Sequence, residues 1–165
     1  MNLEVMETVL DRGACLVGMG NPYRSDDAVG TIIAERIAAV APEDSIQVIN
    51  AEDVLESYLF KIADMPGDTV VLVDAIQTGS EPGTVIFGEL SELDELIQNI
   101  STHKLSLRLC DTVLRDHGKR TYLLGIEAED IDFGSELTGH VARTADIITD
   151  YILNILHSSP KGVDR

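Results

Sequence analysis

Apolar positions along the chain alternate between short continuous runs and stretches with helical spacing. The runs are rich in β-branched residues and end in glycine or an acid, which is typical of strands buried on both faces. They predict strands at residues 15–20, 46–49, 69–74, 84–87 and 122–126. Between them, apolar residues recur every three or four positions, which predicts helices at residues 25–40, 54–62, 105–114 and 141–155. Ser25 is the expected N-cap of the first helix, and the acids that follow it suit a first helical turn.

The predicted order of elements is β-α-β-α-β-β-α-β-α. The turn at residues 79–83 is too short for a parallel crossover, so the fourth strand should run antiparallel. We therefore expect one three-layer α/β domain over residues 1–165, with its core at about 14–156. Its sheet should be mixed, mostly parallel and of about five strands, with helices on both faces. If the first two helices cover opposite faces, the strand order 2-1-3 creates a topological switch point.

Composition narrows the class of protein. The chain of 165 residues is 44% hydrophobic and 25% charged, which is ordinary for a globular domain, but its formal net charge is −17. That charge argues against nucleic acid as a partner, and solubility alone would explain it equally well. No basic residue precedes Arg12, no apolar run approaches the roughly 18 residues of a membrane span, and two cysteines make no disulfide framework. We therefore expect a cytoplasmic monomer that does not insert into membranes.

The glycine-rich segment 18–27 joins the first strand to the first helix, an arrangement also found in dinucleotide-binding proteins. The dinucleotide fingerprint requires a third glycine where Tyr23 stands, and an acid ending the second strand, where Asn50 stands. Asp26 and Asp27 in the first helical turn would also repel a pyrophosphate. The chain has no phosphate-loop lysine followed by serine or threonine. The pattern therefore does not favour nucleotide binding.

The same segment can instead place a carboxylate near the end of the first strand. Asp27 follows the first strand and Asp74 ends the third, so the order 2-1-3 would bring both carboxylates to one crevice at the switch point. Asp27 has an alternative role as a helix-terminus acid, whereas an acid ending an apolar strand is costly without a partner. His103 lies just before the third long helix, where a loop residue could reach the crevice and would contribute little packing. A structural role for this histidine stays open.

Motifs for nucleophilic catalysis are missing from the sequence. There is no G-x-S-x-G elbow, no Cys-x-x-Cys pair and no His-Glu-x-x-His zinc motif. Cys15 lies inside a predicted buried strand. Cys110 and His117 are separated by about 10 Å along their predicted helix, at 1.5 Å per residue, so they would not form a catalytic pair.

Several segments together resemble the hydrogenase maturation protease family, the endopeptidases that remove a C-terminal extension from the [NiFe]-hydrogenase large subunit. The resemblance spans roughly residues 14–155 and is carried by segments 18–22, 26–30, 71–76, 101–107, 124–127 and 134–138. It implies three nickel ligands that also form the catalytic site. By position these are Asp27, where the family often has glutamate, Asp74 and His103.

The resemblance also implies the substrate and the role of the metal. The partner would be a large-subunit precursor that already carries nickel, and the protease would check for that nickel before cleavage. An imidazole beside two carboxylates is a donor set that suits nickel. The metal could position the substrate, polarise a carbonyl or activate water, and an aspartate could act as general base. Two other functions stay open: a non-catalytic nickel-sensing chaperone that uses the same three residues, and a small-molecule phosphorylase or hydrolase built on a similar sheet.

Overall fold

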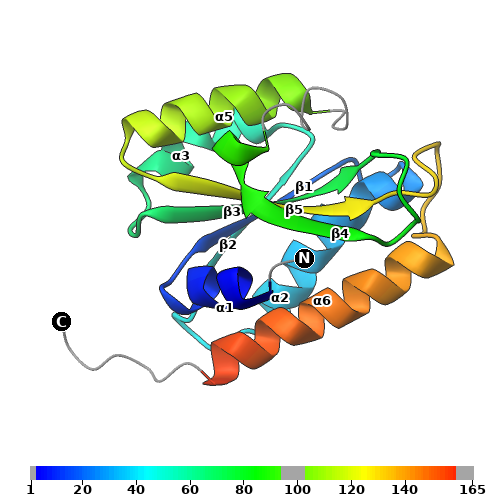
Figure 1. Cartoon of the computed structure of the whole chain (residues 1–165), viewed down its shortest axis with the longest axis horizontal. Helices are drawn as coiled ribbons and strands as arrows, with labels where there is room; N and C mark the ends of the chain where they lie inside the picture. The colour runs from blue at the N-terminus through cyan, green and yellow to red at the C-terminus, as the bar shows by residue number, and fades with distance from the viewer. Residues whose placement is uncertain (1–2, 94–102, 159–165) are drawn as a thin grey trace.

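The computed structural model describes residues 3–93 and 103–158, which form a three-layer α/β domain (Figure 1). The strands are β1 (Cys15–Met19), β2 (Gln47–Glu52), β3 (Thr69–Ile76), β4 (Val85–Glu89) and β5 (Arg120–Glu127). The α-helices are α1 (Leu3–Asp11), α2 (Val29–Val40), α3 (Leu59–Asp64), α5 (Lys104–Asp116) and α6 (Gly139–Ser158). Short 3₁₀ turns are η1 (Ser25–Ala28), η2 (Leu55–Tyr58) and η3 (Leu90–Glu92). The predicted fold class is confirmed.

The sheet has the order β2-β1-β3-β5-β4. β1 pairs in parallel with both β2 and β3, so the predicted switch point lies between the first and third strands. β4 pairs with β5 in the antiparallel direction, as the short turn after β3 requires.

Two apolar cores fill the space on the two faces of the sheet. Successive strand residues point to opposite faces, so Val71 and Val73 enter the core beneath α1, α2 and α6, whereas Val70 and Leu72 enter the core beneath α3 and α5. Figure 1 shows α3 and α5 on one side of the sheet and α1, α2 and α6 on the other. This double coverage explains the continuous apolar runs in the sequence.

Three details differ from the sequence-based expectations. Residues 3–11 form a helix that was not predicted, and it buries Met6, Val9 and Leu10 at helical spacing. Ser25 is not an N-cap: it has a φ of 45° inside η1, and its hydroxyl donates to the carbonyl of Asp132 rather than receiving a helix amide. The predicted helix at 54–62 is divided into η2 and α3. In the described part of the chain, no helix combines the length and hydropathy that crossing a membrane demands.

Candidate active site

Glycines allow the segment after β1 to pack directly on the ends of two strands. A Cβ atom at Gly30 would lie 2.0 Å from the carbonyl oxygen of Val73 and 2.5 Å from that of Met19. Gly20 has a φ of 120°, and a Cβ there would lie 1.6 Å from the carbonyl oxygen of Asp27. Only glycine fits either position, so η1 and the start of α2 lie against the carboxyl ends of β1 and β3.

Asp27 is held in this close packing. Asp27 is only 4% exposed, and its Oδ2 accepts a hydrogen bond of 2.9 Å from the backbone amide of Asn21. The Oδ1 of Asn21 in turn accepts a 2.9 Å hydrogen bond from the amide of Tyr23. The carboxylate therefore has a fixed direction at the end of β1, rather than the freedom of an exposed helix-terminus acid.

Asp74 and His103 contact each other across one face of the sheet. Asp74 lies on β3, is fully buried, and faces the same side as Val70 and Leu72. His103 occupies the N-cap position of α5, with its Nδ1 3.3 Å from Oδ2 of Asp74. His103 precedes the helix as expected, but its side chain is only 14% exposed, so the expectation that it contributes little packing is wrong. Residues 101 and 102 of the same motif lie outside the described residues.

The charges around His103 link it to Asp27 as well. The hydrogen bond from Asp74 is the main cause of its raised pKa, followed by the charges of Asp74, Asp27 and Asp53, while burial acts in the opposite direction. Asp27 therefore lies within electrostatic reach of the imidazole, although its carboxylate accepts its hydrogen bond from the amide of Asn21. In residues 3–93 and 103–158, no group of three acidic, histidine or cysteine side chains is already arranged to hold a metal ion. The three-ligand arrangement stays a prediction.

A buried carboxylate beside Asp27 was not recognised from the sequence. Asp26 is 0% exposed and accepts hydrogen bonds from the amides of Glu129, Asp130 and Thr138 and from the hydroxyl of Thr138. The only signal in the sequence was that two aspartates are adjacent. The two adjacent side chains therefore have different surroundings. Asp26 binds a loop that is distant in sequence, whereas Asp27 lies at the candidate site.

A second missed contact holds the start of α5. The hydroxyl of Ser106 donates to the carboxylate of Glu56 in η2, and this hydrogen bond is the main cause of the lowered pKa of Glu56. His103 lies one helical turn before Ser106, and its charge also lowers the pKa of Glu56. The contact therefore ties the helix that carries the imidazole to the segment after β2.

Neither cysteine has the properties of a nucleophile. Burial raises the pKa of Cys15 to about 11 and that of Cys110 to about 12, so both remain thiols at neutral pH. The Nδ1 of His117 lies 2.7 Å from the carbonyl oxygen of Val113, one turn earlier on α5. The structure therefore defines an α/β protein in which Asp27 lies beside the carboxyl ends of β1 and β3 and Asp74 contacts His103, and these three residues are its candidates for chemistry.

Comparison with known proteins identifies the family. The sequence profile of the hydrogenase maturation protease family (HycI) matches residues 31–155, well over half of the chain. This protein belongs to that family. The Hydrogenase 3 maturation protease of Escherichia coli K12 is 28% identical over 134 residues, which cover 81% of this chain and 84% of the relative.

Solved structures agree with this assignment. The [NiFe] hydrogenase maturation protease HycI from Thermococcus kodakarensis superposes with a TM-score of 0.81 at 31% identity, covering 93% of this chain and 99% of the other. The hydrogenase maturating endopeptidase HybD from E. coli gives a TM-score of 0.73 at 26% identity, covering 90% and 93% of the two chains.

Proposed function

We propose that this protein is an endopeptidase that removes the C-terminal extension of a [NiFe]-hydrogenase large-subunit precursor after nickel has been inserted. We further propose that it recognises the nickel of the precursor through Asp27, Asp74 and His103. The observation that supports this most directly is the contact between buried Asp74 and His103, at the strand ends where Asp27 is also held. A buried carboxylate requires a partner, and a histidine and a cation both satisfy that requirement.

The donor atoms of the three residues fit nickel carried by a substrate. Imidazole nitrogen suits nickel, while carboxylate oxygens alone would prefer harder cations such as magnesium. Three protein ligands also leave positions for groups of the client polypeptide. When present, the nickel would supply positive charge that positions the scissile region and polarises it.

The chain's own residues have distinct roles in this proposal. Asp74 orients the imidazole by its hydrogen bond to Nδ1. The amide of Asn21 holds the Asp27 carboxylate in place. Either aspartate can take a proton from an attacking water, whose oxygen forms the new bond to the peptide carbonyl carbon. The C–N bond then breaks and the leaving amine takes up a proton, so hydrolysis needs no serine or cysteine nucleophile.

The test uses a purified large-subunit precursor prepared with and without nickel. Mass spectrometry after incubation should show loss of the C-terminal extension only from the nickel-loaded form. Binding of loaded precursor without any shortening would favour the nickel-sensing chaperone instead. Equal cleavage of both forms would remove nickel recognition from the proposal. The expected cytoplasmic location and monomeric state stay predictions.

A further inference from the structure

Two of the most exposed aromatic side chains of the described chain lie on segments that meet beside the candidate site. Tyr23 is 72% exposed and Phe133 is 89% exposed, although the whole sequence has only four tyrosines and three phenylalanines. An isolated exposed apolar residue is normal, but neighbouring ones on a rigid support indicate a binding surface.

The two segments are joined by backbone pairing. Arg24 and Gly134 form a parallel bridge, in which the amide of Gly134 donates to the carbonyl of Tyr23 and the amide of Ser25 donates to that of Gly134, both at 3.0 Å. Tyr23 and Phe133 each precede a member of this bridge, so they occupy matched positions in register. A Cβ at Gly134 would lie 2.3 Å from the Ser25 hydroxyl oxygen, so a side chain there would displace this hydroxyl from its hydrogen bond to Asp132. We call these two side chains and their supporting segments, 21–25 and 129–138, the aromatic ridge.

Buried Asp26 holds the ridge in place. Its carboxylate receives hydrogen bonds from both ends of the 129–138 loop, at 2.9 and 3.0 Å from residues 129 and 130, and at 2.7 and 2.9 Å from the amide and hydroxyl of Thr138. The guanidinium Nε of Arg24 also donates to the carbonyl of Ile131. A surface loop with no regular structure is thus fixed in position, which lowers the entropy cost of binding a partner.

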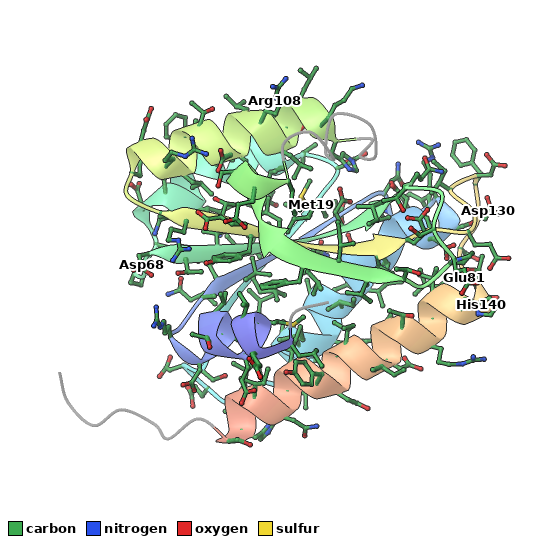
Figure 2. The ribbon with its side chains drawn as sticks, in the orientation of Figure 1. Met19, Asp68, Glu81, Arg108, Asp130 and His140 are labelled. Carbon is green, nitrogen blue, oxygen red and sulfur yellow. The ribbon has the colours of Figure 1, made fainter. Side chains whose placement is uncertain are left out.

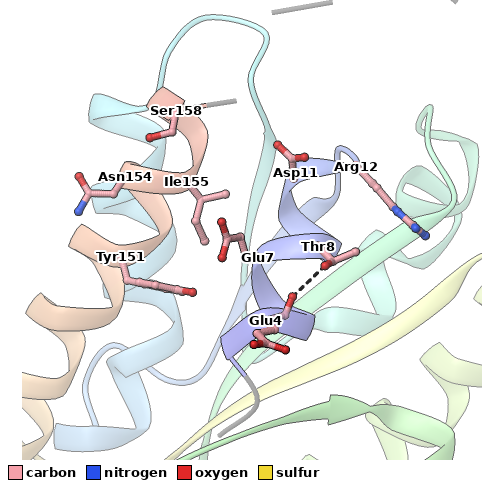
Figure 3. A pocket seen from close by; sticks show the side chains of 9 residues that line it. All are labelled: Glu4, Glu7, Thr8, Asp11, Arg12, Tyr151, Asn154, Ile155 and Ser158. Atoms are coloured by element: carbon pink, nitrogen blue, oxygen red, sulfur yellow. Dashed lines mark hydrogen bonds between the residues drawn. The ribbon is translucent and has the colours of Figure 1, made fainter. Parts of the chain in front are cut away.

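The aromatic ridge is adjacent to the candidate site. Asp27 follows Asp26 directly, and its carboxylate accepts the amide of Asn21, two residues before Tyr23. A polypeptide held on the ridge would therefore run past Asp27. By contrast, the acidic groove between α1 and α6, lined by Glu4, Glu7 and Tyr151, lies beside the other end of α6 (Figure 3). The groove begins at Tyr151, which is roughly 20 Å along α6 from the ridge at 1.5 Å per helical residue, so it is a separate surface.

The charge of the ridge indicates what it binds. Four exposed acids flank Phe133 in the sequence: Glu129, Asp130, Asp132 and Glu136. The ridge has one basic residue, Arg24, whose guanidinium is directed to the carbonyl of Ile131. Figure 2 shows Asp130 at the same end of the sheet as Glu81, from the turn between β3 and β4. An apolar patch with an acidic rim complements an apolar side chain flanked by lysine or arginine.

We propose that the aromatic ridge binds a segment of the client polypeptide in which an apolar side chain is flanked by basic residues, and so positions the scissile region beside Asp27. This inference rests on the proposed endopeptidase function. Tyr23 and Phe133 supply binding energy and do not touch the reacting atoms.

The experiment compares wild-type protein, the Tyr23→Ala/Phe133→Ala double variant and a control, Ile147→Ala, which removes a side chain 61% exposed on α6. Binding of nickel-loaded precursor is measured directly, and cleavage is measured in parallel as kcat and KM. The double variant should bind at least tenfold more weakly and raise KM by a similar factor, with kcat unchanged, because aromatic anchors commonly dominate interfaces. Ile147→Ala should match the wild type.

A second variant tests the acidic rim. Glu129→Gln with Glu136→Gln should weaken binding severalfold at low salt and make the affinity less dependent on salt. An affinity of the aromatic double variant within twofold of the control, or a loss confined to kcat, would overturn the proposed docking role. If wild-type protein binds precursor but never shortens it, while the aromatic variant loses binding, the endopeptidase function fails and the ridge stands as a binding surface.

Discussion

The Nδ1 of His103 lies 3.3 Å from the Oδ2 of Asp74, which joins the N-terminus of α5 to the end of the central strand β3. Asp74 is completely buried, so this contact is formed away from water. The hydrogen bond and the nearby carboxylates raise the pKa of His103 despite its burial. The imidazole therefore holds a proton more tightly than a free histidine does.

This relationship predicts the titration of the metal-free protein. NMR should give His103 a pKa above the value of about 6.5 for an unperturbed histidine, and Asp74→Asn should lower it. Because the folded pKa is the higher one, the stabilisation should be fully present below about pH 6.5 and lost as pH rises through the folded value. An unchanged His103 titration in Asp74→Asn would rule out the contact as the cause.

Thiol chemistry should have no part in cleavage. Burial raises the pKa of Cys110 to about 12 and that of Cys15 to about 11, so neither should react with iodoacetamide in the native protein at pH 8. Mass spectrometry should find both alkylated only after denaturation. Cleavage of precursor should survive the treatment of native protein. Loss of cleavage upon modification of Cys110 in protein that stays folded would contradict a mechanism based on carboxylates and imidazole.

The fold was largely predictable because its three central strands, β1, β3 and β5, are buried on both faces. The continuous apolar run at Thr69–Ile76 is typical of a buried strand, and the short turn after it requires β4 to be antiparallel. The N-terminal helix was not predicted, although Met6, Val9 and Leu10 have helical spacing, because it lies before the first strand and outside the alternation of strands and helices. The prediction that Ser25 is an N-cap was wrong because its positive φ depends on the tertiary contact with Gly134.

The sequence predicted that Asp27, Asp74 and His103 would lie near the carboxyl ends of the first and third strands, but it did not predict their surroundings, and their joint role as a site stays a prediction. Strand order alone brings Asp27 and Asp74 to one edge, and the position before α5 brings His103 there. The division of roles between Asp26 and Asp27 could not be predicted, since it depends on a loop a hundred residues away in sequence. The burial of His103 depends in the same way on contacts across the sheet.

The two adjacent aspartates should therefore respond differently to substitution. Asp26→Ala removes an acceptor of four hydrogen bonds and should lower the free energy of unfolding by about 3 kcal/mol or more. Asp27→Ala removes the acceptor of one backbone amide and should cost about 1–2 kcal/mol, while abolishing cleavage. Urea denaturation and the cleavage assay measure the two effects, with exposed Asp150→Ala as the control. Equal loss of stability in both variants would contradict this division.

Replacing His103 by alanine should abolish cleavage and also destabilise the protein measurably. The imidazole is 14% exposed and hydrogen-bonded to a fully buried carboxylate, so its loss should cost about 1–3 kcal/mol rather than the few tenths typical of a surface residue. The functional loss has a different cause. Two carboxylates without an imidazole discriminate poorly between nickel and magnesium, and glutamine at this position should not restore cleavage because its amide is a weak nickel ligand.

The assay separates the two effects by working well below the melting temperature, where His103→Ala and His103→Gln are both folded by circular dichroism. His140→Ala, which removes an exposed histidine from α6, should cleave nickel-loaded precursor at the wild-type rate. A structural role for His103 predicts instead that cleavage falls only in proportion to the unfolded fraction. Folded His103→Ala that cleaves near the wild-type rate would take the imidazole out of the site, and the two aspartates alone would then have to account for nickel recognition.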